Sequence, residues 1–313
     1  MVVPGFPADD QDDCTPGVAR WVRELAKDGP VDVWTLQYPR RRGVWTAFGA
    51  TVHGCGRSGA GAGLRAIPSV LRAIIAEHRR APFAEVHGVW AEESGLAAVV
   101  AARAIGVPSV VTATGVEFAG PDDLPGRRAW RRTLAHRVVA MADRVEVPSN
   151  WLAAKCPVPC TIHPLPFDAE HFRRPRVASG HRLLCVAGLV PAKGVQDVLA
   201  ALPLVRALLP AATLDIAGDG PLRSELERVA GTLGGVRFLG QVRYAQMPDV
   251  YANADILVHA SRWEAQGLII DEALAAGLRV VATAVGRAAD LPDAVAVGDV
   301  RALADAILTA AKS

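Results

Sequence analysis

The sequence has few aromatic residues, little net charge and no long apolar run, and each shortage excludes a class of protein. Aromatics make up 5% of the 313 residues while about half are hydrophobic, which favours buried parallel strands and packed helices over a β-sandwich or barrel. A formal net charge of +2 gives no overall field that would attract nucleic acid. The best apolar run, near 95–102, stops at Arg103 and is too short to span a bilayer.

Cysteine is also scarce, and its spacing carries no metal site. The five cysteines form an odd set, and Cys156 and Cys160 have neither the spacing of a zinc knuckle nor a second pair beside them. Free thiols are the default in a reducing cytosol, and the N-terminus lacks the charged and apolar regions of a signal peptide. We therefore expect a cytoplasmic protein that binds no metal.

Local basic clusters exist despite the small net charge. Arg127, Arg128, Arg131 and Arg132 fall at helical spacing around Trp130, so one helix face could meet an anionic acceptor or a membrane surface. An ordinary solvated helix face is the alternative. Peripheral membrane contact and oligomer formation both stay open.

Strand-like and helix-like segments alternate along two stretches of the chain, which indicates βαβ units and parallel sheets. We predict an N-terminal Rossmann-like domain over residues 1–165, a linker rich in Pro, Gly and charge over 166–180, and a C-terminal Rossmann-like domain over 181–313. Ligands of such folds bind at the carboxyl ends of the strands, so a site is expected in a cleft between the halves. The expected strands are 31–36, 50–55, 85–89, 109–114 and 144–148, then 182–187, 213–217, 236–239, 255–260 and 279–282.

The strongest motif runs from Ser261 to Gly277. A strand ends at Ser261, a loop carries Glu264, and Gly267 opens an apolar helix whose free amides suit anionic or hydroxyl oxygens. Glu272 lies further along this helix among apolar residues, where a carboxylate needs partners that ligand hydroxyls would supply. Acidic residues also favour early helix turns for electrostatic reasons, so the spacing alone leaves function and structure equally open.

A second motif, residues 186–194, places Lys193 just before a helix start. A full positive charge there adds to the helix dipole and suits a diphosphate. Only four of the 34 Lys and Arg residues are lysines, although a surface lysine remains the alternative. A third motif at 217–223 is a glycine turn that leads into a helix. It is no dinucleotide fingerprint, because Arg223 stands where the third glycine would be.

Four segments in this order resemble one known family: AGLVPAKGV (187–195), LDIAGDGPLRSELE (214–227), VRFLGQV (236–242) and ASRWEAQGLIIDEALAAGLRVVATAVG (260–286). They resemble the C-terminal half of glycosyltransferase family 4, whose members are retaining transferases of the GT-B fold. Glu264 and Glu272 match the E-x7-E element of that family. The resemblance implies an α/β protein of two Rossmann-like domains with parallel sheets facing a central cleft. The N-terminal half resembles the family only loosely.

The resemblance also implies that the C-terminal domain binds a nucleoside-diphosphate sugar as donor, without a cofactor. Glu264 would contact the transferred sugar near its reacting face, Lys193 the diphosphate and Glu272 the ribose hydroxyls. Cations and amides placed in this way would stabilise the charge that builds on the departing diphosphate. Backbone contacts complete the implied donor site: the amides of Gln266, Gly267 and Leu268 would meet sugar hydroxyls and phosphate, and the backbone near Gln241 and Val242 would read the base.

The sequence departs from the family pattern in both halves. Thr114 stands where the family has a catalytic-site histidine, and a hydroxyl cannot hold a proton at neutral pH as an imidazole can. Gly17 is a candidate for the glycine-rich turn that faces the phosphates, or simply a glycine at a helix start. Gly188 occupies a place where the family often has an arginine, and we hypothesise that Arg287 substitutes for it.

The sequence therefore predicts a metal-independent, retaining glycosyltransferase that moves a sugar from a nucleoside diphosphate to a small-molecule, glycan or lipid-linked acceptor. Nucleic acid is not an expected partner. One alternative is a catalytically degenerate subunit that binds nucleotide sugars, which Gly188 and Thr114 would suit. Another is a nucleotide-sugar epimerase or hydrolase of the same fold. The sequence identifies neither the sugar, the base nor the acceptor.

Overall fold

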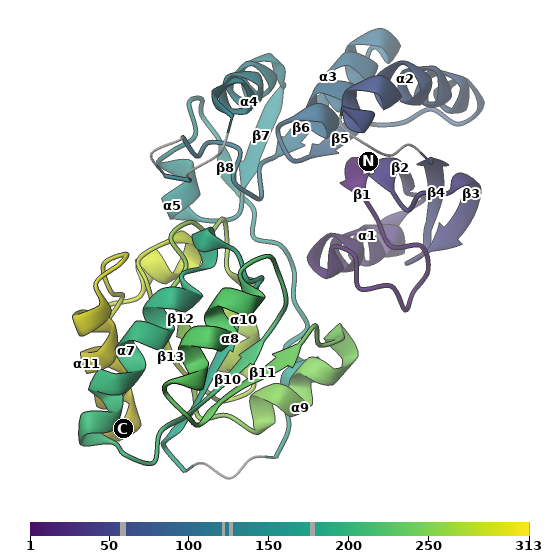
Figure 1. Cartoon of the computed structure of the whole chain (residues 1–313). Helices are drawn as coiled ribbons and strands as arrows, with labels where there is room; N and C mark the ends of the chain where they lie inside the picture. The colour runs from purple at the N-terminus through teal and green to yellow at the C-terminus, as the bar shows by residue number, and fades with distance from the viewer. Residues whose placement is uncertain (57–60, 121–122, 125–127, 176–178, 313) are drawn as a thin grey trace. The chain divides into compact units, whose positions relative to one another are not determined.

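The computed structural model divides the chain into two compact α/β units, Met1–Pro166 and Phe167–Ser313 (Figure 1). It describes residues 1–56, 61–120, 123–124, 128–175 and 179–312. Arg127 of the basic cluster lies outside these ranges. Within them, none of the helices combines the length and apolar character needed to cross a membrane.

The N-terminal unit is built on a sheet with the strand order β3-β4-β2-β1-β5-β6-β7-β8. Neighbouring strands are parallel except for β3 and β4, which form an antiparallel edge. The chain builds the sheet outward from β1 in one direction and then continues from β5 in the other, so the switch point lies between β1 and β5. The strands are β1 (Val2–Gly5), β2 (Asp32–Tyr38), β3 (Arg42–Ala47), β4 (Ala50–Cys55), β5 (Val86–Val89), β6 (Ser109–Thr112), β7 (Arg144–Val147) and β8 (Thr161–Ile162).

Helices cover both faces of this sheet because neighbouring strand residues point to opposite sides. Val2 belongs to the hydrophobic cluster beneath α2 (Ala62–Arg80) and α3 (Glu93–Ile105). Val3 belongs to the cluster beneath α1 (Pro16–Asp28) on the other face (Figure 1). The remaining helices of this unit are α4 (Ala129–Met141) and α5 (Asn150–Ala153).

A glycine contact explains how α3 lies so close to the sheet. A Cβ on Gly88 in β5 would come within 2.7 Å of the Gly95 Cα in α3 and 2.9 Å of the Ala98 Cβ. Real Cβ atoms do not approach other heavy atoms that closely, so this strand and helix depend on small residues. The abundance of Ala and Gly in the sequence therefore reflects close packing of helices on parallel strands.

The C-terminal unit contains a parallel sheet with the order β11-β10-β9-β12-β13. The chain moves outward from β9 to β10 and β11, then returns to the other side of β9 with β12. The switch point of this sheet is therefore the crevice between β9 and β12. The strands are β9 (Arg182–Val186), β10 (Thr213–Ala217), β11 (Val236–Gly240), β12 (Ile256–His259) and β13 (Arg279–Ala282).

The two faces of the C-terminal sheet have separate cores. Val258 packs in the cluster that includes α7 (Val195–Leu208) and α11 (Val300–Lys312), and Leu257 packs in the cluster on the opposite face. The second cluster includes α9 (Met247–Ala252) and α10 (Leu268–Ala275). The helix α8 (Arg223–Gly231) joins β10 to β11.

Part of the segment expected to be a linker contributes to the C-terminal core. Residues Ala169–Phe172 form the short helix α6, and the Phe172 ring is fully buried. It packs edge-on against Tyr251 and Tyr244, with ring centroids 5.6 Å apart in both cases. The charged residues and prolines around α6 led to the prediction of a linker, although Phe172 is buried in the core.

Candidate active site

Two loops at the switch point of the C-terminal sheet are bound to each other. The loop after β9 ends in a 3₁₀ turn, Pro191–Lys193, and the loop after β12 begins at Ala260. The Arg262 N–H donates to the Ala192 carbonyl at 2.8 Å, and the Arg262 guanidinium donates to both carboxylate oxygens of Asp197 at 2.7 and 2.9 Å. These bonds hold the two loops in one arrangement at the carboxyl ends of β9 and β12.

Gly194 is required where the two loops touch. Its φ of 63° lies in the left-handed region, and a Cβ at this position would collide with the carbonyl oxygen of Ala260. The glycine therefore allows α7 to begin directly against the neighbouring loop. This close approach positions Lys193, the preceding residue.

The structure brings Lys193 and Glu264 together. The Lys193 Nζ donates to Glu264 Oε2 at 2.6 Å, and the Glu264 side chain is 18% exposed. Burial alone would raise the Glu264 pKa, but the nearby Lys193 ammonium holds it below its usual value. A carboxylate and an ammonium therefore lie side by side at the switch point.

His259, the last residue of β12, is a member of this group that sequence reasoning missed. Its Nε2 lies 3.8 Å from Glu264 Oε2. The residue is 3% exposed, and its Nε2 has no hydrogen-bond partner among the described residues. Burial lowers the His259 pKa to about 4, with Glu264 acting in the opposite direction, so the imidazole is neutral at pH 7.

The start of α10 forms the next part of the site. Gly267 adopts a φ of 85°, and a Cβ there would lie 3.3 Å from Glu264 Cγ. Leu268 is the first residue of α10, and N–H groups in the first turn of a helix have no carbonyl one turn earlier. Gln266 is buried just before the helix. Gln266, Gly267 and Leu268 therefore follow Glu264 in one strand-to-helix junction whose amides can meet oxygen atoms.

Glu272 is buried on α10 and is oriented by a tyrosine. The Tyr251 hydroxyl donates to Glu272 Oε2 at 2.8 Å. Burial and the nearby carboxylate raise the Tyr251 pKa well above its ordinary value, so this hydroxyl keeps its proton. The sequence predicted ligand hydroxyls as partners of Glu272, and the structure adds Tyr251 as a protein partner.

Arg287 lies beside the Glu264 loop. It follows Gly286, where a Cβ would come within 3.2 Å of the Glu264 backbone oxygen, and its N–H donates to the Gln266 carbonyl at 2.9 Å. Its Nε pairs with the buried carboxylate of Asp271 at 2.7 Å. Arg287, which we hypothesise replaces the arginine that the family often has at position 188, therefore lies near the strand-to-helix junction before α10. Asp271 fixes one edge of its guanidinium.

Gln241 and Val242 lie further along the same edge of the sheet. They follow β11, and the Gly218 N–H donates to the Gly240 carbonyl at 2.8 Å. A Cβ on Gly218 would in turn collide with the carbonyl of Ala187 after β9. The glycine turn after β10 therefore contacts the loops after β9 and β11, so the loops of these three neighbouring strands lie side by side at the carboxyl end of the sheet.

In the N-terminal unit, Thr114 lies in the loop after β6 and belongs to a separate group. Its Oγ1 is buried and has no hydrogen-bond partner among the described residues. Glu117, which is 1% exposed, accepts the N–H groups of Thr114 at 3.1 Å, Gly115 at 2.7 Å and Ala91 at 3.3 Å. Burial raises the Glu117 pKa, and these hydrogen bonds oppose the effect. Sequence reasoning did not identify Glu117 as the residue that fixes this loop.

Gly17 is the second residue of α1, which follows β1 at the switch point of the N-terminal sheet. The loop between β1 and α1 is held by Asp12, whose carboxylate accepts from the Ala8 and Cys14 N–H groups and from the Tyr38 hydroxyl. Gly17 therefore lies beyond the carboxyl end of β1, at the same end of the sheet as the loop that carries Thr114.

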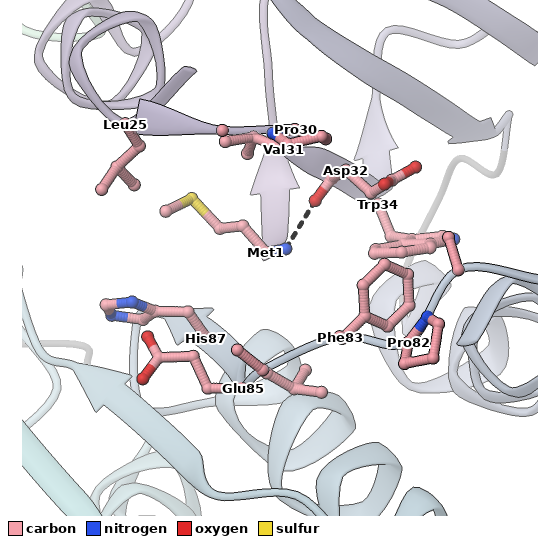
Figure 2. Close-up of a pocket in the computed structure, with 14 residues that line it drawn as sticks. Met1, Leu25, Pro30, Val31, Asp32, Trp34, Pro82, Phe83, Glu85 and His87 are labelled. Carbon is pink, nitrogen blue, oxygen red and sulfur yellow. Dashed lines mark hydrogen bonds between the residues drawn. The ribbon is translucent and has the colours of Figure 1, made fainter. Parts of the chain in front are cut away.

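A cavity of about 420 Å³ lies near the amino ends of strands in the N-terminal sheet (Figure 2). Leu25, Trp34 and Phe83 supply apolar walls, and Glu85 and His87 lie at one side. Its walls are near the amino ends of β2 and β5, whereas Thr114 follows the carboxyl end of β6. This cavity is therefore separate from the carboxyl ends of the strands, where doubly wound sheets bind their ligands.

The fold and the charged group at the β9–β12 switch point define a class of protein. GT-B proteins characteristically combine two α/β units built on mostly parallel sheets. Here the C-terminal sheet also carries charged residues at its β9–β12 switch point and a glycine before α10. Among the described residues, no three His, Cys, Asp or Glu side chains are grouped to hold a metal ion.

Comparison with known families identifies the chain more closely. Residues 14–157 match the family model "Glycosyl transferase 4-like domain", and residues 180–313 match "Glycosyl transferases group 1". The chain belongs to the group 1, family 4-like glycosyltransferases. The family and the GT-B fold predicted from the sequence are both confirmed.

Individual relatives cover the chain to different extents. It is 28% identical over 237 residues to the GDP-mannose-dependent alpha-(1-6)-phosphatidylinositol monomannoside mannosyltransferase of Mycobacterium tuberculosis, covering 68% of this chain and 60% of that protein. It is 38% identical over 124 residues to glycogen synthase of the same organism, covering 39% of this chain and 29% of that enzyme. The chain thus spans less than two thirds of the length of these relatives.

A solved structure supports the fold. Sucrose-phosphate synthase from Thermosynechococcus elongatus has a TM-score of 0.79 and 20% sequence identity to this chain, covering 98% of this chain and 88% of its own. At that identity the likeness establishes the architecture alone.

Proposed function

We propose that the protein is a retaining glycosyltransferase that uses a nucleoside-diphosphate hexose as donor. The observation that carries the proposal is the pairing of Lys193 with Glu264 directly before the α10 start, at the sheet's switch point. Lys193 would bind the diphosphate and Glu264 the sugar. Glu272, oriented by Tyr251, would bind the ribose hydroxyls. The backbone at Gln241 and Val242 would face the base.

Positive charge and amides provide the chemistry of the proposed reaction. The bond between the sugar C1 and the diphosphate oxygen breaks, and negative charge builds on that oxygen. Lys193 and the amides at Gly267 and Leu268 stabilise this charge without a metal. The acceptor hydroxyl attacks C1 from the face that the diphosphate leaves, and its proton passes to the departing oxygen. The configuration at C1 is thereby retained.

We further propose an anionic, lipid-linked acceptor. Arg128 and Arg132 are exposed at the start of α4, next to Trp130, which is 43% exposed. Arg131 pairs with Glu92, which follows the Ala91 that donates to Glu117 in the Thr114 loop. The basic start of α4 and Thr114 are therefore tied to the same segment after β5. The mycobacterial relative named for a phosphatidylinositol mannoside supports this choice.

Two measurements test the proposed function. A thermal-shift screen with GDP-mannose, UDP-glucose, GDP and UDP identifies the donor, because a ligand that binds only the folded state raises the melting temperature. NMR of reactions with the stabilising donor and phosphatidylinositol vesicles then identifies the product. An α-glycoside from an α-donor supports the transferase. Free sugar or an epimer supports a hydrolase or epimerase, and donor binding without turnover supports a degenerate subunit.

A further inference from the structure

His259 is a buried imidazole with an unused nitrogen that lies near the proposed sugar-binding carboxylate. Its Nε2 is 3.8 Å from Glu264 Oε2, and no hydrogen bond satisfies this nitrogen among the described residues. Buried polar atoms without partners are uncommon because they lose the hydrogen bonds they make in water. A movement of about 1 Å would bring these two atoms within hydrogen-bond distance.

The same Oε2 atom already has one partner. Lys193 Nζ donates to it at 2.6 Å, so Glu264 lies between an ammonium and a neutral imidazole. In the proposed function Lys193 also binds the donor diphosphate. A diphosphate draws Lys193 away from Glu264 and places further negative charge beside it. The carboxylate then needs a second positive partner.

We propose that His259 becomes this partner, taking up a proton at Nε2 when the donor diphosphate engages Lys193, and so keeps Glu264 anionic and fixed in the sugar site. This inference rests on the proposed function. His259 acts through Glu264 and is a positioning residue. The proton comes from solvent, and no covalent bond forms or breaks.

Within the described parts of the chain, the other ionisable groups near His259 have partners of their own or lie on the opposite face of the sheet. On α10, Asp271 pairs with Arg287, and Glu272 accepts from Tyr251. On the adjacent strand β9, Cys185 packs in the cluster on the opposite sheet face, and burial raises its thiol pKa to about 12. Glu264 and Lys193 are therefore the charges that govern the protonation of His259.

The sign of the pH dependence follows from proton uptake. Free His259 has a pKa lowered to about 4 by burial, and loss of the Lys193 charge beside Glu264 raises it. A ligand whose binding adds a proton binds more tightly at lower pH. Donor affinity should therefore fall as pH rises through the raised pKa of the complex, by up to about tenfold per pH unit.

Isothermal titration calorimetry of UDP-glucose and GDP-mannose, in buffers with different ionisation enthalpies, measures the uptake directly. At pH 6.5 we expect about 0.3 to 1 proton per bound donor in the native chain. His259→Gln should bind donor without uptake. His181→Gln, which removes a half-buried histidine of the same unit whose Nδ1 lies 3.1 Å from the Ser179 carbonyl oxygen, should retain the uptake.

Glu264→Gln provides a second variant that leaves the histidine in place. Without the Glu264 charge the His259 pKa stays low, so proton uptake on donor binding should also disappear. Donor binding with no buffer dependence, or with uptake that persists in His259→Gln, overturns the inference while leaving the proposed function intact. Absence of binding by either donor overturns both.

Discussion

Lys193 and Glu264 are 71 positions apart in sequence, yet their side chains meet at 2.6 Å between the loops that follow β9 and β12. The Arg262–Asp197 bonds and the close contact at Gly194 hold these loops together. The pair is thus assembled by the crossover order of the sheet.

Replacement of Lys193 by alanine should reduce kcat/KM by about 100-fold or more, the usual effect of removing one group that stabilises developing charge. The lost charge also leaves Glu264 without its ammonium partner. Steady-state release of nucleoside diphosphate measures the effect. Lys155→Ala, which removes a lysine over the Trp151 ring in the other unit, serves as control. Equal rates for the two variants would show that Lys193 does not bind the diphosphate.

Glu272→Gln should weaken donor binding through the ribose. The loss should be about tenfold, the scale of a hydrogen bond to a charged group. The selective measurement compares UDP or GDP with its 2′,3′-dideoxy form in the native chain and the variant. The native chain should prefer the hydroxylated nucleotide, and Glu272→Gln should bind both alike. Tyr251→Phe should give a smaller loss, because the carboxylate stays in place. An unchanged preference in Glu272→Gln would contradict the assignment.

Arg287→Ala tests whether this residue substitutes for the arginine absent at Gly188. If it does, the donor dissociation constant should rise by about tenfold or more, since a charged hydrogen bond contributes about 1–3 kcal/mol. Asp271→Asn is the matched comparison, because it loosens the Arg287 guanidinium without removing its charge. An unchanged dissociation constant in Arg287→Ala would eliminate the hypothesis.

Gly194→Ala should disturb both folding and the site. The added Cβ would collide with the Ala260 carbonyl, and the left-handed φ adds about 1 kcal/mol or more of strain. The melting temperature should fall, and donor binding should weaken because Lys193 is adjacent. Gly188→Ala is the control, since no heavy atom lies within 4 Å of its added Cβ. Similar melting temperatures for the two variants would refute the packing argument.

Acid should destabilise the C-terminal unit through Asp255. Burial alone would raise its pKa, but hydrogen bonds from Arg182 and Ser179 hold the pKa far below the ordinary value. A group whose pKa is lowered on folding stabilises the fold above its unfolded pKa of about 3.9, and that contribution is lost as pH falls toward the folded value. Asp255→Asn should cost about 1–3 kcal/mol at pH 7, the scale of charged hydrogen bonds, because it removes the carboxylate that Arg182 and Ser179 bind.

Melting temperatures of both forms between pH 7 and pH 2 check the expected effect of Asp255. The gap between the native chain and Asp255→Asn should narrow as the pH falls below about 4, because the unfolded native chain then binds a proton at Asp255 that the folded chain does not, and the variant has no such proton to bind. A gap that stays constant across this range would show that Asp255 does not titrate with folding.

The order of motifs in the sequence predicted the family and brought Lys193 and Glu264 to one site, because loops after strands on either side of a switch point must meet. It did not reveal β1, whose four residues include Pro4 and Gly5 and carry too little pattern to identify a strand. His259 and Glu117 were also missed as site residues. Their importance comes from burial and from partners distant along the chain, which periodicity does not encode.

The three backbone N–H groups that donate to Glu117 limit how the loop with Thr114 can move. They join the turn after β5 to the turn after β6 through one side chain. Neither turn can adjust to a bulky acceptor independently, since a shift of one strains the hydrogen bonds of the other. In the proposed function, acceptor selectivity near the Thr114 loop should therefore depend on shape, and substitutions near Ala91 should alter which acceptors are used.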